Sequence, residues 1–297
     1  MSIAQEIKDS FKYGSVLTRL IYVNIGIFLL FKLIQFVLVL GGNSPENIKP
    51  FLYYFTVPSN LLELLLKPWT IVTYMFAHND FFHLLFNILY IYWFGRIFMS
   101  IIGERLLLRV YFLGGLSGAA LYILSFNIIP TFTNIYGYSE MLGASASAMA
   151  ILFTVSRNQP DYKVNLLFFG PVKMKYIALV ALILDLISIS NMSNTGGHIA
   201  HIGGAIFGLI FGKMILDGKI TYPSEKKQVW NFSFKKRKKL KVMHRRPLTD
   251  MEYNVIKIQR KQEVDRILEK IKQSGYDSLS NEEKKMLFDA SKDDNFN

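Results

Sequence analysis

The stretch G-G-H-I-A-H-I-G-G occupies residues 196–204 and leads into an apolar segment that ends near residue 217. Gly204, Gly208 and Gly212 follow one another at intervals of four, which leaves one face of a helix smooth enough for another helix to approach closely. A glycine packing stripe would explain these glycines, but it would leave His201 unexplained. A neutral imidazole beside a serine can act as its general base, so His201 is a candidate catalytic residue.

Two more polar patterns interrupt apolar segments. The first, H-L-L-F-N, spans His83 to Asn87, and its spacing of four puts both polar side chains on one helical face. Both side chains can donate hydrogen bonds to a developing oxyanion, although a polar pair that holds neighbouring helices together is an equally good interpretation. The second, G-A-S-A, spans Gly143 to Ala146 at the start of an apolar segment.

The position of Ser145 in that second pattern favours a role for it as a nucleophile. We expect it at a helix N-terminus, where free backbone N–H groups and the helix dipole favour negative charge. Small residues with serine are also common at helix contacts, so the pattern alone is weak. Ser147, two residues further on, is expected to be a packing residue.

Composition and hydropathy indicate a membrane protein. The 297 residues are 51% hydrophobic, with a mean hydropathy of +0.26 and a formal net charge of +12. A bilayer core of roughly 30 Å takes about 20 apolar residues to cross as a helix. Six segments reach or approach that length: 17–40, 80–101, 106–128, 142–157, 174–192 and 198–217. The sequence therefore predicts an all-α membrane protein with a bundle of six transmembrane helices, of which the fourth is short.

The charged residues set the expected domains and orientation. Residues 218–297 hold 20 Lys and Arg against 12 Asp and Glu, so most of the net charge lies in this tail. Lys and Arg also gather before the first span and in alternate loops, which predicts that both termini face the cytoplasm. We expect a cytoplasmic N-terminus at 1–16, a six-span domain at 17–217 and a basic cytoplasmic tail at 218–297. The absence of a transit peptide fits a bacterial cell (inner) membrane.

Two regions outside the spans have structure of their own. The long outer loop 43–69 carries apolar residues that predict a structure lying in the membrane interface. In the tail, 235–246 is a basic run that fits an anchor beside anionic lipid head groups, and nucleic-acid binding is not expected. Residues 250–273 show partial helical spacing, and Ser280 with Glu283 forms a capping-box pattern, so a short helical hairpin is expected there.

The three polar patterns, in this order and on the second, fourth and sixth of six spans, resemble the rhomboid family of intramembrane proteases. His83 and Asn87 match the family's H-x-x-x-N, and Gly143 and Ser145 match its G-x-S. Gly196, Ala200, His201 and Gly204 match its G-x-x-x-A-H-x-x-G in full. The likeness covers about residues 60–217 and includes Trp69 before the second span.

This resemblance implies a rhomboid-like bundle and an intramembrane serine endopeptidase that uses a Ser–His dyad rather than a triad. Ser145 would be the nucleophile and His201 the general base and then acid, with Asn87, His83 and the backbone N–H of Ser145 around the oxyanion. The substrates would be transmembrane helices that unwind locally, reached from a water-filled cavity on the outer side. Gly196, Ala200, Gly204, Gly208 and Gly212 would serve helix packing.

The sequence departs from the family at two positions. Ala146 replaces the second glycine of the usual G-x-S-G, and Met149 stands where many members have an aromatic residue. Neither change removes a reacting group. His198 is a rival base that we expect in a loop or at the interface, and a structural role is expected for His78. Asp185, in the middle of the fifth span, is expected to join a hydrogen-bond network or to affect gating.

Other functions are weighed against this one. No H-E-x-x-H or other zinc pattern is present, so neither a metal nor a cofactor is expected. The main alternative is an inactive rhomboid-like protein that binds or chaperones transmembrane helices. A small transporter would require repeated halves, and none is evident. The expected partners are transmembrane-helix substrates and membrane lipids, while the sequence does not predict an oligomeric state.

Overall fold

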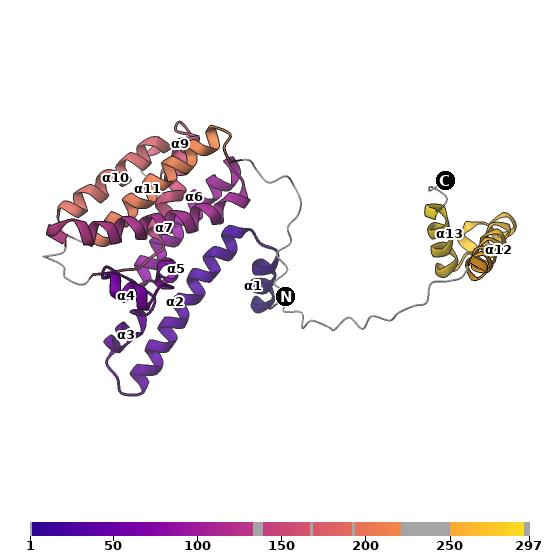
Figure 1. Cartoon of the computed structure of the whole chain (residues 1–297), viewed down its shortest axis with the longest axis horizontal. Helices are drawn as coiled ribbons and strands as arrows, with labels where there is room; N and C mark the ends of the chain where they lie inside the picture. Colours follow the sequence, from indigo (N-terminus) through magenta and orange to yellow (C-terminus); the bar gives the residue numbers. More distant parts are fainter. Residues whose placement is uncertain (1, 133–138, 167–168, 192–193, 221–249, 294–297) are drawn as a thin grey trace. The chain divides into compact units, whose positions relative to one another are not determined.

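The computed structural model describes residues 2–132, 139–166, 169–191, 194–220 and 250–293 (Figure 1). The chain is mostly helical and divides into two compact units, residues 1–226 and 227–297, which are described separately. The basic run predicted at 235–246 lies outside the described residues.

Each of the six predicted apolar segments contains a helix. These are α2 (Val16–Leu40), α6 (Phe81–Ile101), α7 (Glu104–Ile128), α9 (Ser145–Asn158), α10 (Met174–Ser190) and α11 (Thr195–Leu216). By length and composition, α2, α6, α7 and α11 are four helices that can cross a membrane. Helices α9 and α10 are shorter, with 14 and 17 residues. The protein is therefore a helical membrane protein, while the count of six spans stays a prediction.

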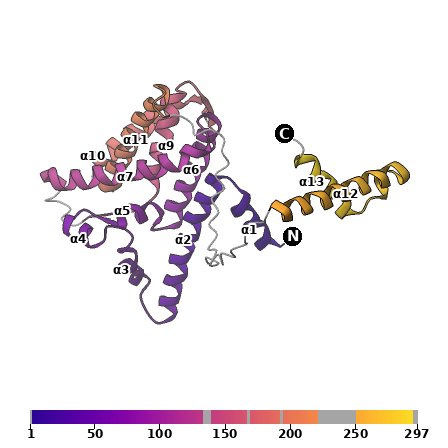
Figure 2. The same ribbon diagram turned by 45° about the vertical axis from the view of Figure 1, so that its right-hand side comes forward.

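Helix α9 forms the centre of the first unit. Every residue from Ala146 to Ser156 is buried, although only some of these side chains are large and apolar. The helix packs most extensively against α11, and it also contacts α6, α7 and α10, which surround it in both views (Figures 1 and 2). At about 1.5 Å per residue, a helix of this length is too short to cross a bilayer core alone. Other helices surround its buried residues, whereas Arg157 near its C-terminal end is exposed.

The outward surface of α10 is apolar, as contact with lipid requires. Six of its leucine, isoleucine and valine side chains are exposed, whereas the only buried residues of the helix are Met174, Ala178 and Asp185. Exposed apolar side chains of this kind also run along α2. A soluble protein rarely shows so large a continuous apolar surface. The buried carboxylate of Asp185 is the exception on this helix and belongs to the candidate site.

The N-terminal region and the outer loop contain short elements. Helix α1 (Ile3–Tyr13) was not expected from the sequence. The outer loop contains η1 (Pro45–Ile48), α3 (Lys49–Leu52), β1 (Val57–Pro58) and α4 (Leu61–Leu66), followed by α5 (Thr70–Thr73) and η2 (Tyr74–Phe76). Four leucines of α4 are exposed, as a helix lying in the membrane interface would have them. The indole of Trp69 donates to the carbonyl oxygen of Tyr54 at 2.8 Å, which ties the end of the loop back onto its middle.

Backbone pairing fixes the segment that precedes α9. Strand β2 (Glu140–Met141) pairs antiparallel with β1, with Val57 opposite Met141 and Pro58 opposite Glu140. The N–H of Gly143 then donates to the carbonyl oxygen of Tyr74 at 2.9 Å. Between α9 and α10, β3 (Lys163–Leu166) pairs antiparallel with β4 (Gly170–Lys173).

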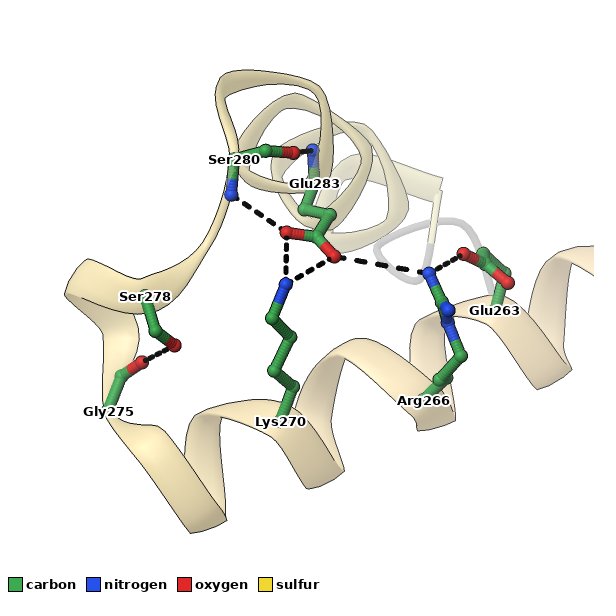
Figure 3. Close-up of polar contacts among 7 residues, drawn as sticks. All are labelled: Glu263, Arg266, Lys270, Gly275, Ser278, Ser280 and Glu283. Carbon is green, nitrogen blue, oxygen red and sulfur yellow. Dashed lines mark hydrogen bonds and ion pairs between the residues drawn. The ribbon is translucent and has the colours of Figure 1, made fainter.

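The second unit contains a pair of packed helices. Helix α12 (Asp250–Ser274) ends at Gly275, whose φ of +78° suits glycine, and the chain continues through η3 (Tyr276–Ser278) into α13 (Asn281–Asp293). The expected capping box is present, because Glu283 N–H donates to Ser280 Oγ and Ser280 N–H donates to the Glu283 carboxylate. Lys270 on α12 pairs with Glu283 at 2.9 Å and joins the two helices (Figure 3).

Candidate active site

Ser145 is the first residue of α9, as predicted. The preceding Ala144 has a side chain that cannot accept a hydrogen bond, so no capping side chain occupies the N–H groups of the first turn at this position. A helix N-terminus in this state attracts developing negative charge. The side chain of Ser145 is partly exposed, whereas that of Ser147 is fully buried.

Gly143 brings the start of α9 against the polar pair of α6. Its φ of +116° is in the region that favours glycine, and a Cβ atom built there would lie 2.7 Å from His83 Nε2 and 3.8 Å from Asn87 Nδ2. Asn87 is buried, and its amide donates to the carbonyl oxygen of His83 at 2.9 Å, which leaves one amide hydrogen free of that bond. The first glycine of G-x-S is therefore needed for both its backbone conformation and this close approach.

Glycines bring the other side of α9 against α11. A Cβ atom on Gly204 would overlap the carbonyl oxygen of Ala146, and one on Gly208 would lie 2.5 Å from the carbonyl oxygen of Ala150. A Cβ atom on Gly212 would lie 2.9 Å from Arg157 Cβ. The stripe read from the sequence is thus a contact between two helix backbones.

The N-terminal part of the same stripe faces α7 instead. A Cβ atom on Gly196 would lie 2.8 Å from Tyr122, and the carbonyl oxygen of the buried Ala200 would be 2.8 Å from a Cβ atom on Gly118. Gly118 also accommodates Ala146, because a Cβ atom on Gly118 would lie 2.6 Å from the methyl group of Ala146. The alanine that departs from G-x-S-G therefore fits against a glycine of α7. Met149, at the second departure, is buried in the core.

Asp185 of α10 joins two histidines of α11. His201 Nδ1 lies 2.8 Å from Asp185 Oδ1, and His198 Nδ1 lies 2.7 Å from the same oxygen. A carboxylate can only accept hydrogen bonds, so with Asp185 ionised each contact requires the tautomer that carries the ring proton on Nδ1. The three side chains are 7%, 20% and 18% exposed for Asp185, His198 and His201. Their ligand atoms lie within 4.8 Å of one another, a spacing that also suits a metal ion.

The structure corrects the expectation for His198. It lies inside α11, which begins at Thr195, rather than in a loop, while its expected position at the membrane interface stays a prediction. The helix starts three residues before the predicted span, and the spacing of three puts His198 and His201 almost one turn apart on one face. Both rings therefore reach Asp185. Of the two roles left open for Asp185 by the sequence, a hydrogen-bond network or an effect on gating, the structure shows the network.

His78 lies between η2 and α6, outside the long helices, and its ring lies beside that of His83. Its Nδ1 is 3.2 Å from the carbonyl oxygen of Phe76, and its ring centroid is 5.2 Å from that of His83. Burial, with a smaller contribution from the nearby His83, lowers the pKa of His78 to about 4. His78 is therefore neutral near pH 7, which fits the expected structural role.

Ser145 and His201 approach the same place from two helices. Ser145 precedes Ala146, which touches Gly204, and His201 lies one turn before Gly204 on α11. His201 also lies within electrostatic range of His83. Within the part of the chain that the structure describes, however, Ser145 and His201 share no hydrogen bond. Helices α6, α9 and α11 thus converge here without a direct bond between the two residues.

A comparison with known protein families identifies the family of this chain. The family model described as "Rhomboid domain" matches residues 66–218, just over half of the chain and all three motifs. The chain belongs to the rhomboid family. A second family model, for a family of unknown function, matches residues 249–293, which include α12 and α13.

Two curated proteins are similar to this rhomboid. "RHOMBOID-like protein 12, mitochondrial" from Arabidopsis thaliana is 26% identical over 161 residues, which cover 52% of this chain and 48% of that protein. "Presenilin-associated rhomboid-like protein A, mitochondrial" from Danio rerio is 29% identical over 136 residues, covering 45% of this chain and 34% of that protein. The chain thus spans less than half the length of each relative.

Reasoning from the sequence of this rhomboid identified Asp185 as unusual but did not find its partners. A carboxylate within an apolar helix is costly unless it is paired, and His198 and His201 recur at a helical spacing of three. Together these two signals could have paired Asp185 with both histidines. What the sequence does not contain is the rotation of the fifth helix against the sixth, which brings Asp185 to both rings.

Proposed function

We propose that this rhomboid is an intramembrane serine endopeptidase that hydrolyses peptide bonds in or near transmembrane helices. The observation that supports it most is the packing on either side of Ser145. Gly143 lies against His83 and Asn87, while Ala146 lies against Gly204, one turn from His201. A nucleophile between oxyanion donors and a base is what acyl transfer requires.

In the proposed reaction, Ser145 Oγ attacks the scissile carbonyl carbon and its proton passes to His201. The oxygen of the tetrahedral intermediate accepts hydrogen bonds from the Ser145 backbone N–H, Asn87 Nδ2 and His83. His201 then gives the proton to the leaving amine, and water hydrolyses the acyl-enzyme by the same route. Loss of one such oxyanion donor typically costs about 10²–10³ in turnover.

The substrates proposed are transmembrane helices that unwind locally. A closed helix uses its peptide carbonyls in internal hydrogen bonds and hides them from attack. Partial exposure of Ser145, His198 and His201 supports the proposed access by water. Two cavities lie between α2 and α6, and neither Ser145 nor His201 lines them.

The alternative proposal is an inactive rhomboid-like protein that binds transmembrane helices. The missing hydrogen bond between Ser145 and His201, among the described residues, favours this alternative. Catalytic hydrogen bonds are often long before a substrate binds, so we retain the protease as the first proposal.

For the membrane context, we propose six spans, with the N-terminal segment 1–16 and the tail 218–297 on the cytoplasmic side. The distribution of Lys and Arg in the loops supports this orientation. A cell membrane was the expectation from the sequence, whereas both curated relatives carry "mitochondrial" in their names. We therefore propose two alternative locations, the inner mitochondrial membrane and the bacterial cell membrane. The same helical bundle could span either one.

Labelling of the nucleophile tests the proposal. The purified protein is treated with a fluorophosphonate, and the modified residue is found by mass spectrometry. Modification of Ser145, retained in Ser147→Ala and abolished in Ser145→Ala, is expected. A folded protein that is unmodified at Ser145 would favour the helix-binding alternative.

A further inference from the structure

Asp185 is a buried carboxylate in the middle of α10, where the exposed side chains from Leu179 to Ile187 are all apolar. Its side chain is 7% exposed, whereas the adjacent Leu184 and Leu186 are 58% and 53% exposed. A charge at the centre of a membrane-spanning helix is costly unless it is paired. Charged residues inside membrane helices pair with other polar groups and mark functional sites.

Asp185 Oδ1 contacts the same ring nitrogen, Nδ1, in both His198 and His201. Donation from Nδ1 of His201 to Asp185 Oδ1 requires the tautomer that carries its proton on Nδ1. The other nitrogen, Nε2, then holds a lone pair. This is the form of imidazole that can take a proton from a serine hydroxyl.

Packing distinguishes His201 from His198. His201 is one turn from Gly204, whose backbone touches Ala146 beside Ser145, and it lies within electrostatic range of His83. His198 lies almost one turn further from that contact, toward the N-terminus of α11. It shares Oδ1 of Asp185 and so holds the carboxylate toward α11 from a second side.

We propose that Asp185 is a positioning residue that completes a Ser145–His201–Asp185 triad in this protein. This inference rests on the proposed protease function. When the bond forms between Ser145 Oγ and the carbonyl carbon, the hydroxyl proton moves to His201 Nε2. Asp185 stays ionised, fixes the Nδ1–H tautomer and stabilises the imidazolium until its proton goes to the leaving amine.

Kinetics of Asp185→Asn test the inference, because asparagine keeps the shape of the side chain and removes its charge. In liposomes with a transmembrane substrate, kcat is expected to fall about 10²-fold or more while KM stays within about 2-fold. Leu184→Ala, a neighbouring exposed position, is the matched control and should keep both constants. A kcat within about 2-fold of wild type in Asp185→Asn would overturn the inference.

Further measurements separate the other outcomes. No cleavage by wild type would refute the protease itself, and activity in Ser145→Ala would refute Ser145 as its nucleophile. An inactive Ser145→Ala beside a fully active Asp185→Asn would refute only the triad. A loss that EDTA reproduces in wild type and added Zn²⁺ reverses would assign the three side chains to a metal instead. Should Asp185→Asn fail to fold, ¹⁵N NMR of wild-type His201 decides: a proton on Nδ1 is expected, and a proton on Nε2 alone overturns the inference.

Discussion

Gly204 of α11 lies against the backbone of Ala146 in α9, so closely that a Cβ atom at position 204 would overlap the Ala146 carbonyl oxygen. This contact sets the separation of the helices that carry Ser145 and His201. Because the obstacle is backbone rather than a flexible side chain, the two helices could accommodate a methyl group there only by moving apart. The distance between the proposed nucleophile and base is therefore controlled by the absence of one methyl group.

The first prediction concerns this contact. Gly204→Ala is expected to destabilise the protein by about 1–3 kcal/mol, because overpacking forces the backbones apart. Proteolysis should fall as well, since a misplacement of about 1 Å can cost about 10²-fold in rate. Thermal unfolding in detergent and cleavage assays measure the two effects.

Gly26→Ala is the matched control for that substitution. Gly26 lies within α2, and a Cβ atom there would have no neighbour within 4 Å. Stability and activity should stay close to wild type. Equal stability of the Gly204 and Gly26 variants would show that α9 and α11 do not touch as described.

A second prediction concerns pH and His78. Burial lowers its folded-state pKa to about 4, below the ordinary 6.5, so the unfolded chain binds the proton more readily. Its contribution to stability is therefore complete above pH 6.5 and is lost as pH falls toward 4, by roughly 3 kcal/mol at most. Unfolding midpoints between pH 7.5 and 4 should fall more steeply in wild type than in His78→Gln, and parallel curves would contradict the assignment.

A third prediction concerns Glu283 in the second unit. The Lys270 ammonium, with the backbone N–H of Ser280, lowers the pKa of Glu283 to about 2 from an ordinary 4.5. Because the folded-state pKa is the lower one, the contribution of this carboxylate is present above pH 4.5 and disappears as pH falls to about 2. The side chains of Glu283 and Lys270 are 15% and 44% exposed, so solvent still screens the pair and the expected effect on stability is small.

The test of that pKa is a carboxyl ¹³C NMR titration of the full chain. Glu283 should titrate near 2 in wild type and move upward in Lys270→Ala. Lys285→Ala is the control, because Lys270 rather than Lys285 pairs with Glu283. If Lys270→Ala leaves the titration unchanged, the ion pair does not join α12 to α13.

Periodicity and local pattern were sufficient to predict much of this fold. Hydropathy located all six helices, because apolar length is a direct requirement of the bilayer. The position of Ser145 at a helix start was also predicted, and so was the capping box at Ser280 and Glu283. These features depend on residues close together in the sequence.

Long-range relationships were not predictable in the same way. The pairing of Asp185 with His198 and His201 depends on how α10 and α11 are rotated toward each other, and a single sequence does not contain that rotation. The fit of Ala146 against Gly118 likewise joins α9 and α7. The pairing of β1 with β2, which holds the segment before Ser145, joins short strands without a recognisable alternation.

Cleavage of a transmembrane substrate by the purified protein in liposomes tests the central claim most directly. Wild type should cleave, while Ser145→Ala and His201→Ala should lose essentially all turnover and keep their unfolding midpoints; Ser147→Ala should remain active. Equal cleavage by wild type and folded Ser145→Ala would contradict the assignment of Ser145 as the nucleophile.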